Sequence, residues 1–167
     1  MNIVLTGFMG SGKSAVGKIL ADRLKWTFYD TDVLIEKEAG VAISTIFAKK
    51  GEPAFRDMET RTVQLLGLLD KCVIATGGGI PLRPQNMDEL ERNGKVFFLR
   101  ARPETLLERL RDGIDTRPLL KGKDPLLAVE ELLRSRQKAY ARCHHVIDTD
   151  GLSAEEVAEK IIGLMFL

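Results

Sequence analysis

Two short stretches of this 167-residue chain combine residue types that could bind and transfer a phosphate group. The first is Gly7-Phe8-Met9-Gly10-Ser11-Gly12-Lys13-Ser14, which fits the pattern G-x-x-x-x-G-K-[ST] at every fixed position. Glycines let such a loop turn its N–H groups toward phosphate oxygens, the lysine reaches the β- and γ-phosphates, and the hydroxyl can bind Mg²⁺. We therefore predict a nucleotide-phosphate site at Gly10, Ser11, Gly12, Lys13, Ser14 and Ala15.

The second stretch is Asp30-Thr31-Asp32, which follows the short apolar run Trp26–Tyr29. Asp30 is the carboxylate best placed to give Mg²⁺ a second protein contact beside Ser14. Asp32 would then face the phosphoryl acceptor and orient or deprotonate its hydroxyl. The alternative is that one of the two aspartates only caps a helix that starts near Val33.

Two arginines are predicted to serve an anionic acceptor. Arg136 falls in phase with an apolar helical stripe, so it faces inward and requires an anion, either a ligand or an internal carboxylate. Arg56 opens another helix, where Glu59 is three residues on and placed to hold the guanidinium. The stripe consists of Leu126, Val129, Leu133 and Tyr140.

Two further features point to the same site with weaker signals. Gly77-Gly78-Gly79 follows a strand and offers backbone N–H groups to a ligand, although such runs are often only sharp turns. Arg117, in a polar segment at 112–122, could fold over the γ-phosphate, or could simply be a solvated loop residue. Cys143-His144-His145 is disfavoured as a metal site, because adjacent residues do not converge like spaced ligands.

Short apolar runs alternate with helical patterns and predict a parallel sheet covered on both faces. One helical pattern follows the phosphate loop. A second covers 33–50 and is broken at Gly40, and a third is predicted to end at Gly94. Asp124 and Ser153 are predicted to cap the last two helices. Ligands of such sheets bind at the carboxyl ends of the strands, where the residues named above gather. The predicted strands are Ile3–Leu5, Trp26–Tyr29, Cys72–Ala75, Lys95–Leu99 and His145–Ile147.

Composition limits the classes of partner. Hydrophobic residues make up 44% and charged residues 29%, as in a globular domain, and the net charge is +1. No global field therefore attracts nucleic acid or a membrane surface, and no apolar stretch approaches membrane-spanning length. The two cysteines indicate a reducing cytoplasm, and the start in a core strand leaves no room for a signal peptide. We expect one domain and a monomer.

Taken in order, these motifs resemble the shikimate kinase family, and the likeness runs nearly end to end. The phosphate loop alone is common to a vast superfamily, whereas the ordered set is much more specific. The segments that carry the resemblance, after the loop at 7–14, are Asp30-Thr31-Asp32, Glu52 through Phe55-Arg56 to Glu59, Gly77-Gly78-Gly79, Arg117-Pro118-Leu119-Leu120, and Arg136 with Tyr140.

The resemblance implies Mg²⁺- and ATP-dependent phosphorylation of the shikimate 3-hydroxyl, a step of aromatic amino-acid biosynthesis. It implies a three-layer α/β/α P-loop kinase fold with sheet order 2-3-1-4-5. One kinase domain would span 1–167, with a substrate-binding helical insert at about 33–61 and a lid at about 112–122.

The resemblance also implies a role for each matching residue. Lys13 and Ser14 would serve ATP and Mg²⁺ with Asp30, and Asp32 would hydrogen-bond the ring hydroxyls. Arg56 and Arg136 would grip the carboxylate, with Glu59 orienting Arg56 and Gly77–Gly79 lining the pocket. Arg117 would reach ATP from the lid. Either Arg109 or Arg111 would stack on adenine, and Ala15 replaces a hydroxyl residue that many relatives carry, which puts nucleotide affinity in question.

Two other readings compete with this one. A gluconate-type or nucleoside-monophosphate kinase has the same fold, and gluconate is also a carboxylated polyol. A nucleotide-dependent switch or a degenerate binding module is the other class. The switch lacks support because no Asn-Lys-x-Asp motif is present, and a degenerate module should have lost Lys13, Asp32 or an arginine.

Overall fold

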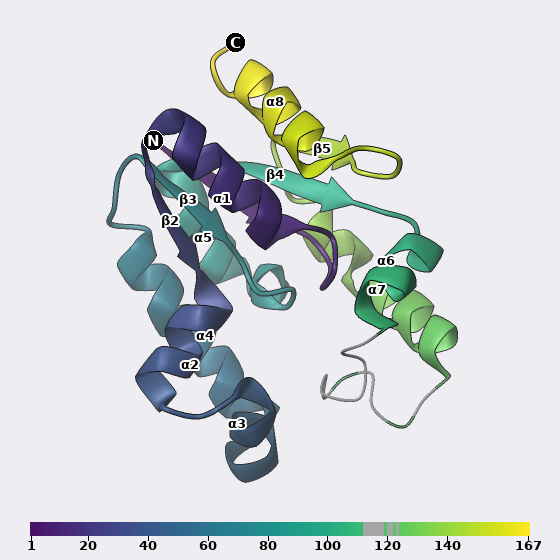
Figure 1. Ribbon diagram of the computed structural model, residues 1–167. Helices are drawn as coiled ribbons and strands as arrows, with labels where there is room; N and C mark the ends of the chain where they lie inside the picture. The colour runs from purple at the N-terminus through teal and green to yellow at the C-terminus, as the bar shows by residue number, and fades with distance from the viewer. Residues whose placement is uncertain (112–118, 120–121, 123) are drawn as a thin grey trace.

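The computed structural model describes residues 1–111, 119, 122 and 124–167 (Figure 1). Five parallel strands form one sheet in the order β2-β3-β1-β4-β5, as predicted. The strands are β1 (Asn2–Thr6), β2 (Thr27–Asp30), β3 (Cys72–Ala75), β4 (Gly94–Arg100) and β5 (His145–Asp148).

Helices cover both faces of this sheet and complete three layers. On one face lie α1 (Lys13–Leu24) and α8 (Ala154–Met165), toward the viewer in Figure 1. On the other face lie α4 (Glu52–Leu66) and α5 (Pro84–Arg92). The central strand β1 serves both layers, because Ile3 and Leu5 pack toward α1 and α8 while Val4 packs toward α4 and α5. A strand buried on both faces reads as a continuous apolar run.

The remaining helices flank the carboxyl edge of the sheet. They are α2 (Thr31–Ala39), α3 (Ile43–Lys50), the single 3₁₀ turn η1 (Ile80–Leu82), α6 (Pro103–Leu110) and α7 (Pro125–Tyr140). The predicted break at Gly40 is confirmed, since Gly40 ends α2 with φ of 72°. The predicted caps are confirmed too. Asp124 accepts a hydrogen bond from the backbone of Leu127, and Ser153 forms a capping box with Glu156.

One predicted boundary is wrong. Gly94 does not end a helix, because α5 already ends at Arg92 and Gly94 is the first residue of β4. Its φ is not positive, so the requirement is space and not backbone conformation. A β-carbon on Gly94 would overlap the carbonyl oxygen of Leu90 and lie 2.9 Å from Val4. The glycine therefore lets β4 begin directly beneath α5.

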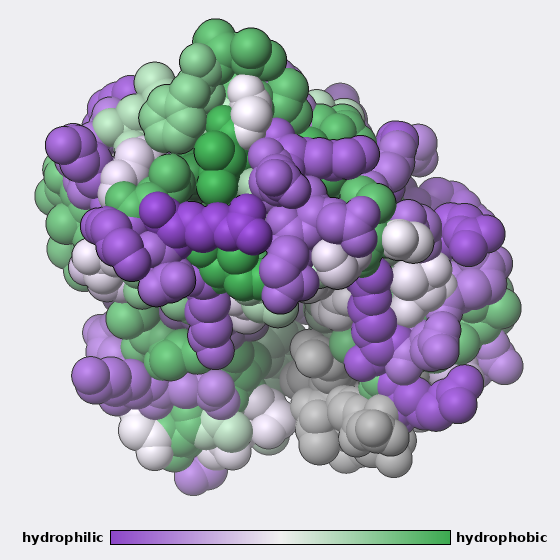
Figure 2. All heavy atoms as spheres, turned by 45° about the horizontal axis from the view of Figure 1, so that its top comes forward, coloured by the Kyte–Doolittle hydropathy of each residue, from purple (hydrophilic) through white to green (hydrophobic). Residues whose placement is uncertain are grey.

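Hydrophilic side chains are spread over the face seen in Figure 2 and alternate with smaller apolar areas. Among the described residues, no helix has both the length and the apolar character needed to cross a membrane.

Candidate active site

The phosphate loop connects β1 to α1 and curls around the amino group of Lys13. Nζ of Lys13 donates hydrogen bonds of 2.7 Å to the carbonyl oxygen of Gly7 and 2.8 Å to that of Phe8. Gly10 and Gly12 have φ of 81° and 96°, a backbone conformation that other residues adopt only at a cost. The local sequence therefore dictates the loop that the motif predicts.

A cavity of about 260 Å³ lies beside this loop. Ser11 does not line it. This serine is 2% exposed, and its hydroxyl lies 3.4 Å from Nζ of Lys13. The other five residues predicted to bind nucleotide phosphates do line the cavity, namely Gly10, Gly12, Lys13, Ser14 and Ala15.

Ser14 and Asp30 meet on the wall of the same cavity. The Ser14 hydroxyl donates a hydrogen bond of 2.6 Å to Oδ2 of Asp30. The other oxygen, Oδ1, accepts from the backbone N–H groups of Asp32 and Val33 and caps α2. The sequence leaves open whether an aspartate of this stretch serves Mg²⁺ or only caps a helix. Asp30 does cap α2, and its second oxygen is bonded to Ser14.

The oxygens of Ser14 and Asp30 suit Mg²⁺, which takes few protein ligands and keeps positions for water and phosphate oxygens. The structure describes no group of three or more His, Cys, Asp or Glu side chains that could hold a metal ion, within residues 1–111 and 124–167. His144 accepts a hydrogen bond of 2.9 Å at Nδ1 from the backbone of Val96, and His145 stacks on Phe97. Both histidines thus serve the packing of β4.

A second cavity of about 360 Å³ adjoins the first. Met9, Asp32 and Gly78 line both cavities, so they form the wall between them. Asp32 is two residues after Asp30, in the first turn of α2, and lines both cavities. The charged side chains that line the second cavity are Asp32, Glu36, Arg56, Glu59 and Arg136.

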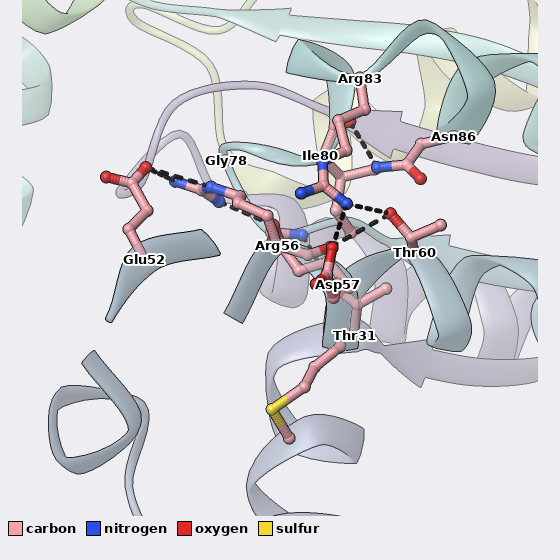
Figure 3. Close-up of polar contacts among 12 residues, drawn as sticks. Thr31, Glu52, Arg56, Asp57, Thr60, Gly78, Ile80, Arg83 and Asn86 are labelled. Carbon is pink, nitrogen blue, oxygen red and sulfur yellow. Dashed lines mark hydrogen bonds and ion pairs between the residues drawn. The ribbon is translucent and has the colours of Figure 1, made fainter. Parts of the chain in front are cut away.

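Arg56, on α4, lines the second cavity and donates hydrogen bonds to two carboxylates. Its guanidinium donates a 2.7 Å hydrogen bond to Glu59 and a 3.1 Å hydrogen bond to Glu52 (Figure 3). Burial alone would lower the pKa of Arg56, but the charges and hydrogen bonds of Glu59 and Glu52 outweigh it, so the pKa is raised. The predicted contact between Arg56 and Glu59 is present, and the guanidinium is a fixed donor.

Glu59 is nearly completely buried, with 1% of its surface exposed. Its Oε1 accepts from Arg56, whereas its Oε2 has no hydrogen-bond partner among the described residues. Burial raises the pKa of the Glu59 carboxyl to about 7, although the charge of Arg56 opposes the shift. Asp32 contributes to the rise because it is a second negative charge nearby.

Arg136, on α7, also lines this cavity and is 2% exposed. Its Nη1 donates a hydrogen bond of 3.3 Å to the Tyr140 hydroxyl, and its Nε has no partner within the described part of the chain. Of the two partners considered from the sequence, an internal carboxylate is therefore not found among the described residues. An arginine buried in this way is suited to an anionic ligand.

The three glycines after β3 pack against these charged groups. A β-carbon at Gly77 would lie 2.6 Å from Asp32 and 2.9 Å from Glu59, and one at Gly78 would lie 2.9 Å from Arg136. None of the three glycines has a positive φ. Close approach is thus the reason for glycine here. The N–H of Gly77 is not offered to a ligand, since it donates to the Thr31 hydroxyl at 2.8 Å.

The turn after the glycines is tied to α4 and α5 (Figure 3). Arg83 donates to Asp57 at 2.8 Å and to the Thr60 hydroxyl at 3.2 Å. Asn86 donates to the carbonyl oxygen of Ile80 at 3.0 Å. These contacts fix the glycine turn between the two cavities.

Comparison with known proteins agrees with this geometry. The family model described as shikimate kinase matches residues 9–165. The chain belongs to the shikimate kinase family. A shikimate kinase of Thermodesulfovibrio yellowstonii is 48% identical over 161 residues, which cover 96% of this chain and 92% of that protein. A shikimate kinase of Acinetobacter baumannii, solved in complex with shikimate, has a TM-score of 0.94 and 38% identity, covering 99% of this chain and 92% of that one.

Membership in the shikimate kinase family also decides between the kinase readings. A gluconokinase of Sinorhizobium meliloti is 19% identical with a TM-score of 0.61, which shows a shared fold alone. The chain is accordingly a kinase of the shikimate kinase family, and neither a switch nor a gluconate-type enzyme. The P-loop fold with sheet order 2-3-1-4-5 is confirmed.

The resemblance to shikimate kinases assigns three arginines to ATP, and the structure describes two of them. Arg109 donates a hydrogen bond of 3.2 Å to the carbonyl oxygen of Gly10 in the phosphate loop. Arg111 is exposed at the end of α6. Arg117 lies outside the described residues, as does most of the predicted lid at 112–122.

Three contact residues were not among the predicted site residues. Glu52 could have been found from its spacing, because it is one helical turn before Arg56. Tyr140 was part of the apolar stripe and of the segments that resemble the family, but its hydroxyl had no predicted role. Thr31 reaches Gly77 across 46 residues of sequence, and no local pattern signals such a contact.

Proposed function

We propose that this chain transfers the γ-phosphoryl group of ATP to the 3-hydroxyl of shikimate and releases shikimate 3-phosphate and ADP. One arrangement supports the proposal most. A cavity with two buried arginines adjoins the phosphate-loop cavity, and Asp32 lines the wall between them. Shikimate carries one carboxylate and several hydroxyls, and the similar protein of Acinetobacter baumannii binds it.

In the proposed reaction, Arg136 and Arg56 bind the carboxylate and so turn the ring hydroxyls toward Asp32. Asp32 accepts the proton of the 3-hydroxyl group while the oxygen of that hydroxyl forms a bond to the γ-phosphorus. The bond from that phosphorus to the bridging oxygen breaks, and ADP leaves with the electron pair. Lys13 stabilises the charge on the phosphate oxygens.

Mg²⁺ bound with ATP would supply positive charge to the β- and γ-phosphates. Ser14 and Asp30 are the proposed protein contacts for this ion, because their oxygens meet on the wall of the nucleotide cavity. Arg117 is proposed to reach ATP from a lid at about 112–122. We also propose one kinase domain over 1–167, with the helical insert at about 33–61, that works as a monomer in the cytoplasm.

The test is a coupled ADP-release assay with Mg-ATP and, separately, shikimate, gluconate or AMP. We expect stimulation by shikimate alone. Arg136→Ala should lower kcat/KM for shikimate by about 100-fold or more, because truncation of a buried charged donor removes a strong contact. Stimulation by gluconate or AMP, and not by shikimate, would contradict the proposed substrate.

Arg134→Ala is the matched control, because Arg134 lies on the same helix and is exposed. It should behave like the unchanged protein. Lys13→Ala should abolish transfer with every acceptor, and activity that survived this change would contradict the phosphate-loop assignment.

A further inference from the structure

Tyr140, near the end of α7, joins two parts of the acceptor cavity through a single hydroxyl. This hydroxyl donates a hydrogen bond of 2.7 Å to the carbonyl oxygen of Gly78 and accepts one of 3.3 Å from Nη1 of Arg136. The side chain is 2% exposed, and its ring packs on Phe98 with centroids 5.1 Å apart. The rigid aromatic body therefore leaves the hydroxyl little freedom to move.

Arg136 is held by groups that carry no negative charge. Besides the Tyr140 hydroxyl, the ring of Phe8 lies 5.8 Å from its Cζ. Within residues 1–111 and 124–167, the structure gives Arg136 no ion pair, and its Nε has no hydrogen-bond partner. A phenol hydroxyl and an aromatic face orient a guanidinium without cancelling its charge.

The second arginine of the cavity, Arg56, has carboxylate partners. Arg56 is paired with Glu59 at 2.7 Å and with Glu52 at 3.1 Å. A carboxylate bound to an arginine competes with an anionic ligand for the same donors. Arg136 differs in that its described contacts are a neutral hydroxyl and an aromatic ring, although its charge also acts to lower the pKa of Glu59.

We propose that Tyr140 is a positioning residue for the phosphoryl acceptor. Its hydroxyl fixes the guanidinium of Arg136 and the carbonyl of Gly78 in one arrangement, so that the carboxylate of the acceptor meets a preformed, positively charged donor. A preformed donor need not be ordered when the ligand binds, and this lowers the cost of binding. The inference rests on the proposed function, in which Arg136 binds the acceptor carboxylate.

Tyr140→Phe removes the hydroxyl and keeps the ring, so it tests this role directly. We expect KM for shikimate to rise by about 10-fold or more, a change typical of losing one hydrogen bond to a charged group. The values of kcat and of KM for ATP should stay within about threefold, because this hydroxyl contacts Gly78 and Arg136 on the acceptor side of the site. Tyr29→Phe is the matched control, since Tyr29 is the other tyrosine of the chain and packs in the β2 region.

Two results would overturn the inference. One is a KM for shikimate in Tyr140→Phe equal to that of Tyr29→Phe. The other is a fall in kcat together with rises of similar size in KM for ATP and KM for shikimate. Such a change would indicate general loosening of the fold.

Crystal structures of the unchanged protein and of Tyr140→Phe separate this inference from the proposed function. We expect the Arg136 guanidinium to shift or lose order in the variant, whichever acceptor the enzyme uses. An Arg136 that kept its place without the hydroxyl would overturn the positioning role. Failure of shikimate to stimulate the unchanged protein would instead overturn the proposed substrate.

Discussion

The guanidinium of Arg56 packs against the α-carbon of Gly79 so closely that a β-carbon on Gly79 would overlap it. The same guanidinium is held by Glu59 at 2.7 Å. A side chain at this position of the glycine turn would therefore have to displace the guanidinium of Arg56. The close packing also sets where the guanidinium stands in the acceptor cavity.

Gly79→Ala should displace Arg56 and weaken its contact with Glu59, because the added methyl group and the guanidinium cannot share the space. We expect KM for shikimate to rise by about 10-fold or more, a change typical of losing a charged hydrogen bond. KM for ATP should change little. Steady-state kinetics with each substrate varied in turn measures both values.

Gly163→Ala is the control for this change. Gly163 lies within α8, and a β-carbon there would meet no heavy atom within 4 Å. Alanine should leave activity unchanged and stabilise the helix by roughly 0.5–1 kcal/mol. If Gly79→Ala behaved like Gly163→Ala, the packing argument for Arg56 would fail.

The sheet and the phosphate loop were predictable because local sequence determines them. The run Ile3-Val4-Leu5 is apolar at consecutive positions, and a strand buried on both faces requires this. The loop needs glycine where φ is positive, and the motif places it there. The order of strands came from the family resemblance, since alternating strands and helices alone do not fix it.

The pair of Arg56 and Glu59 was predictable from its spacing. The network that holds Arg136 was not, because it ends on a distant part of the chain. From the sequence, Arg136 could have met an internal carboxylate or a ligand. The structure gives it the hydroxyl of Tyr140, which in turn bonds Gly78, 62 residues away. Likewise, no pattern shows that one oxygen of Asp30 caps a helix while the other accepts from Ser14.

Asp30→Asn should separate these two roles of Asp30. Asparagine is as good a helix cap as aspartate, so the free energy of unfolding should change by less than about 1 kcal/mol. The charge that attracts Mg²⁺ is lost, and we expect the Mg²⁺ concentration for half-maximal activity to rise by about 10-fold or more. Asp30→Ala, which removes the cap as well, should also cost about 0.5–2 kcal/mol of stability. An unchanged Mg²⁺ requirement in Asp30→Asn would exclude Asp30 as a metal contact.

Arg109 and Arg111 should differ in their effect on ATP. Both side chains are exposed, but Arg109 donates a hydrogen bond to the phosphate loop at Gly10. We expect Arg109→Ala to raise KM for ATP by about 5- to 10-fold because this hydrogen bond is lost. Arg111→Ala should change KM for ATP by less than twofold, since an exposed charge by itself contributes little. Nucleotide titration of both variants provides the comparison. The opposite ranking would assign the adenine contact to Arg111.

The burial of Glu59 makes stability depend on pH in a direction that can be worked out. Its pKa rises from an ordinary value of 4.5 to about 7, chiefly because burial disfavours the charged carboxylate. The folded protein therefore holds a proton that the unfolded chain releases between these values. Stabilisation from this group is complete below about pH 4.5 and is lost as the pH rises through about 7.

Glu59→Gln should remove the pH-dependent contribution of Glu59 to stability, while keeping an oxygen that accepts a hydrogen bond from Arg56. Relative to the variant, the unchanged protein should lose on the order of 3 kcal/mol of unfolding free energy between pH 4.5 and pH 7. Urea denaturation at several pH values gives the difference directly. Glu131→Gln, a change at an exposed position of α7, should follow the curve of the unchanged protein throughout. A constant difference between Glu59→Gln and the unchanged protein across this range would mean that Glu59 is charged in the folded state, with Arg56 outweighing the cost of its burial.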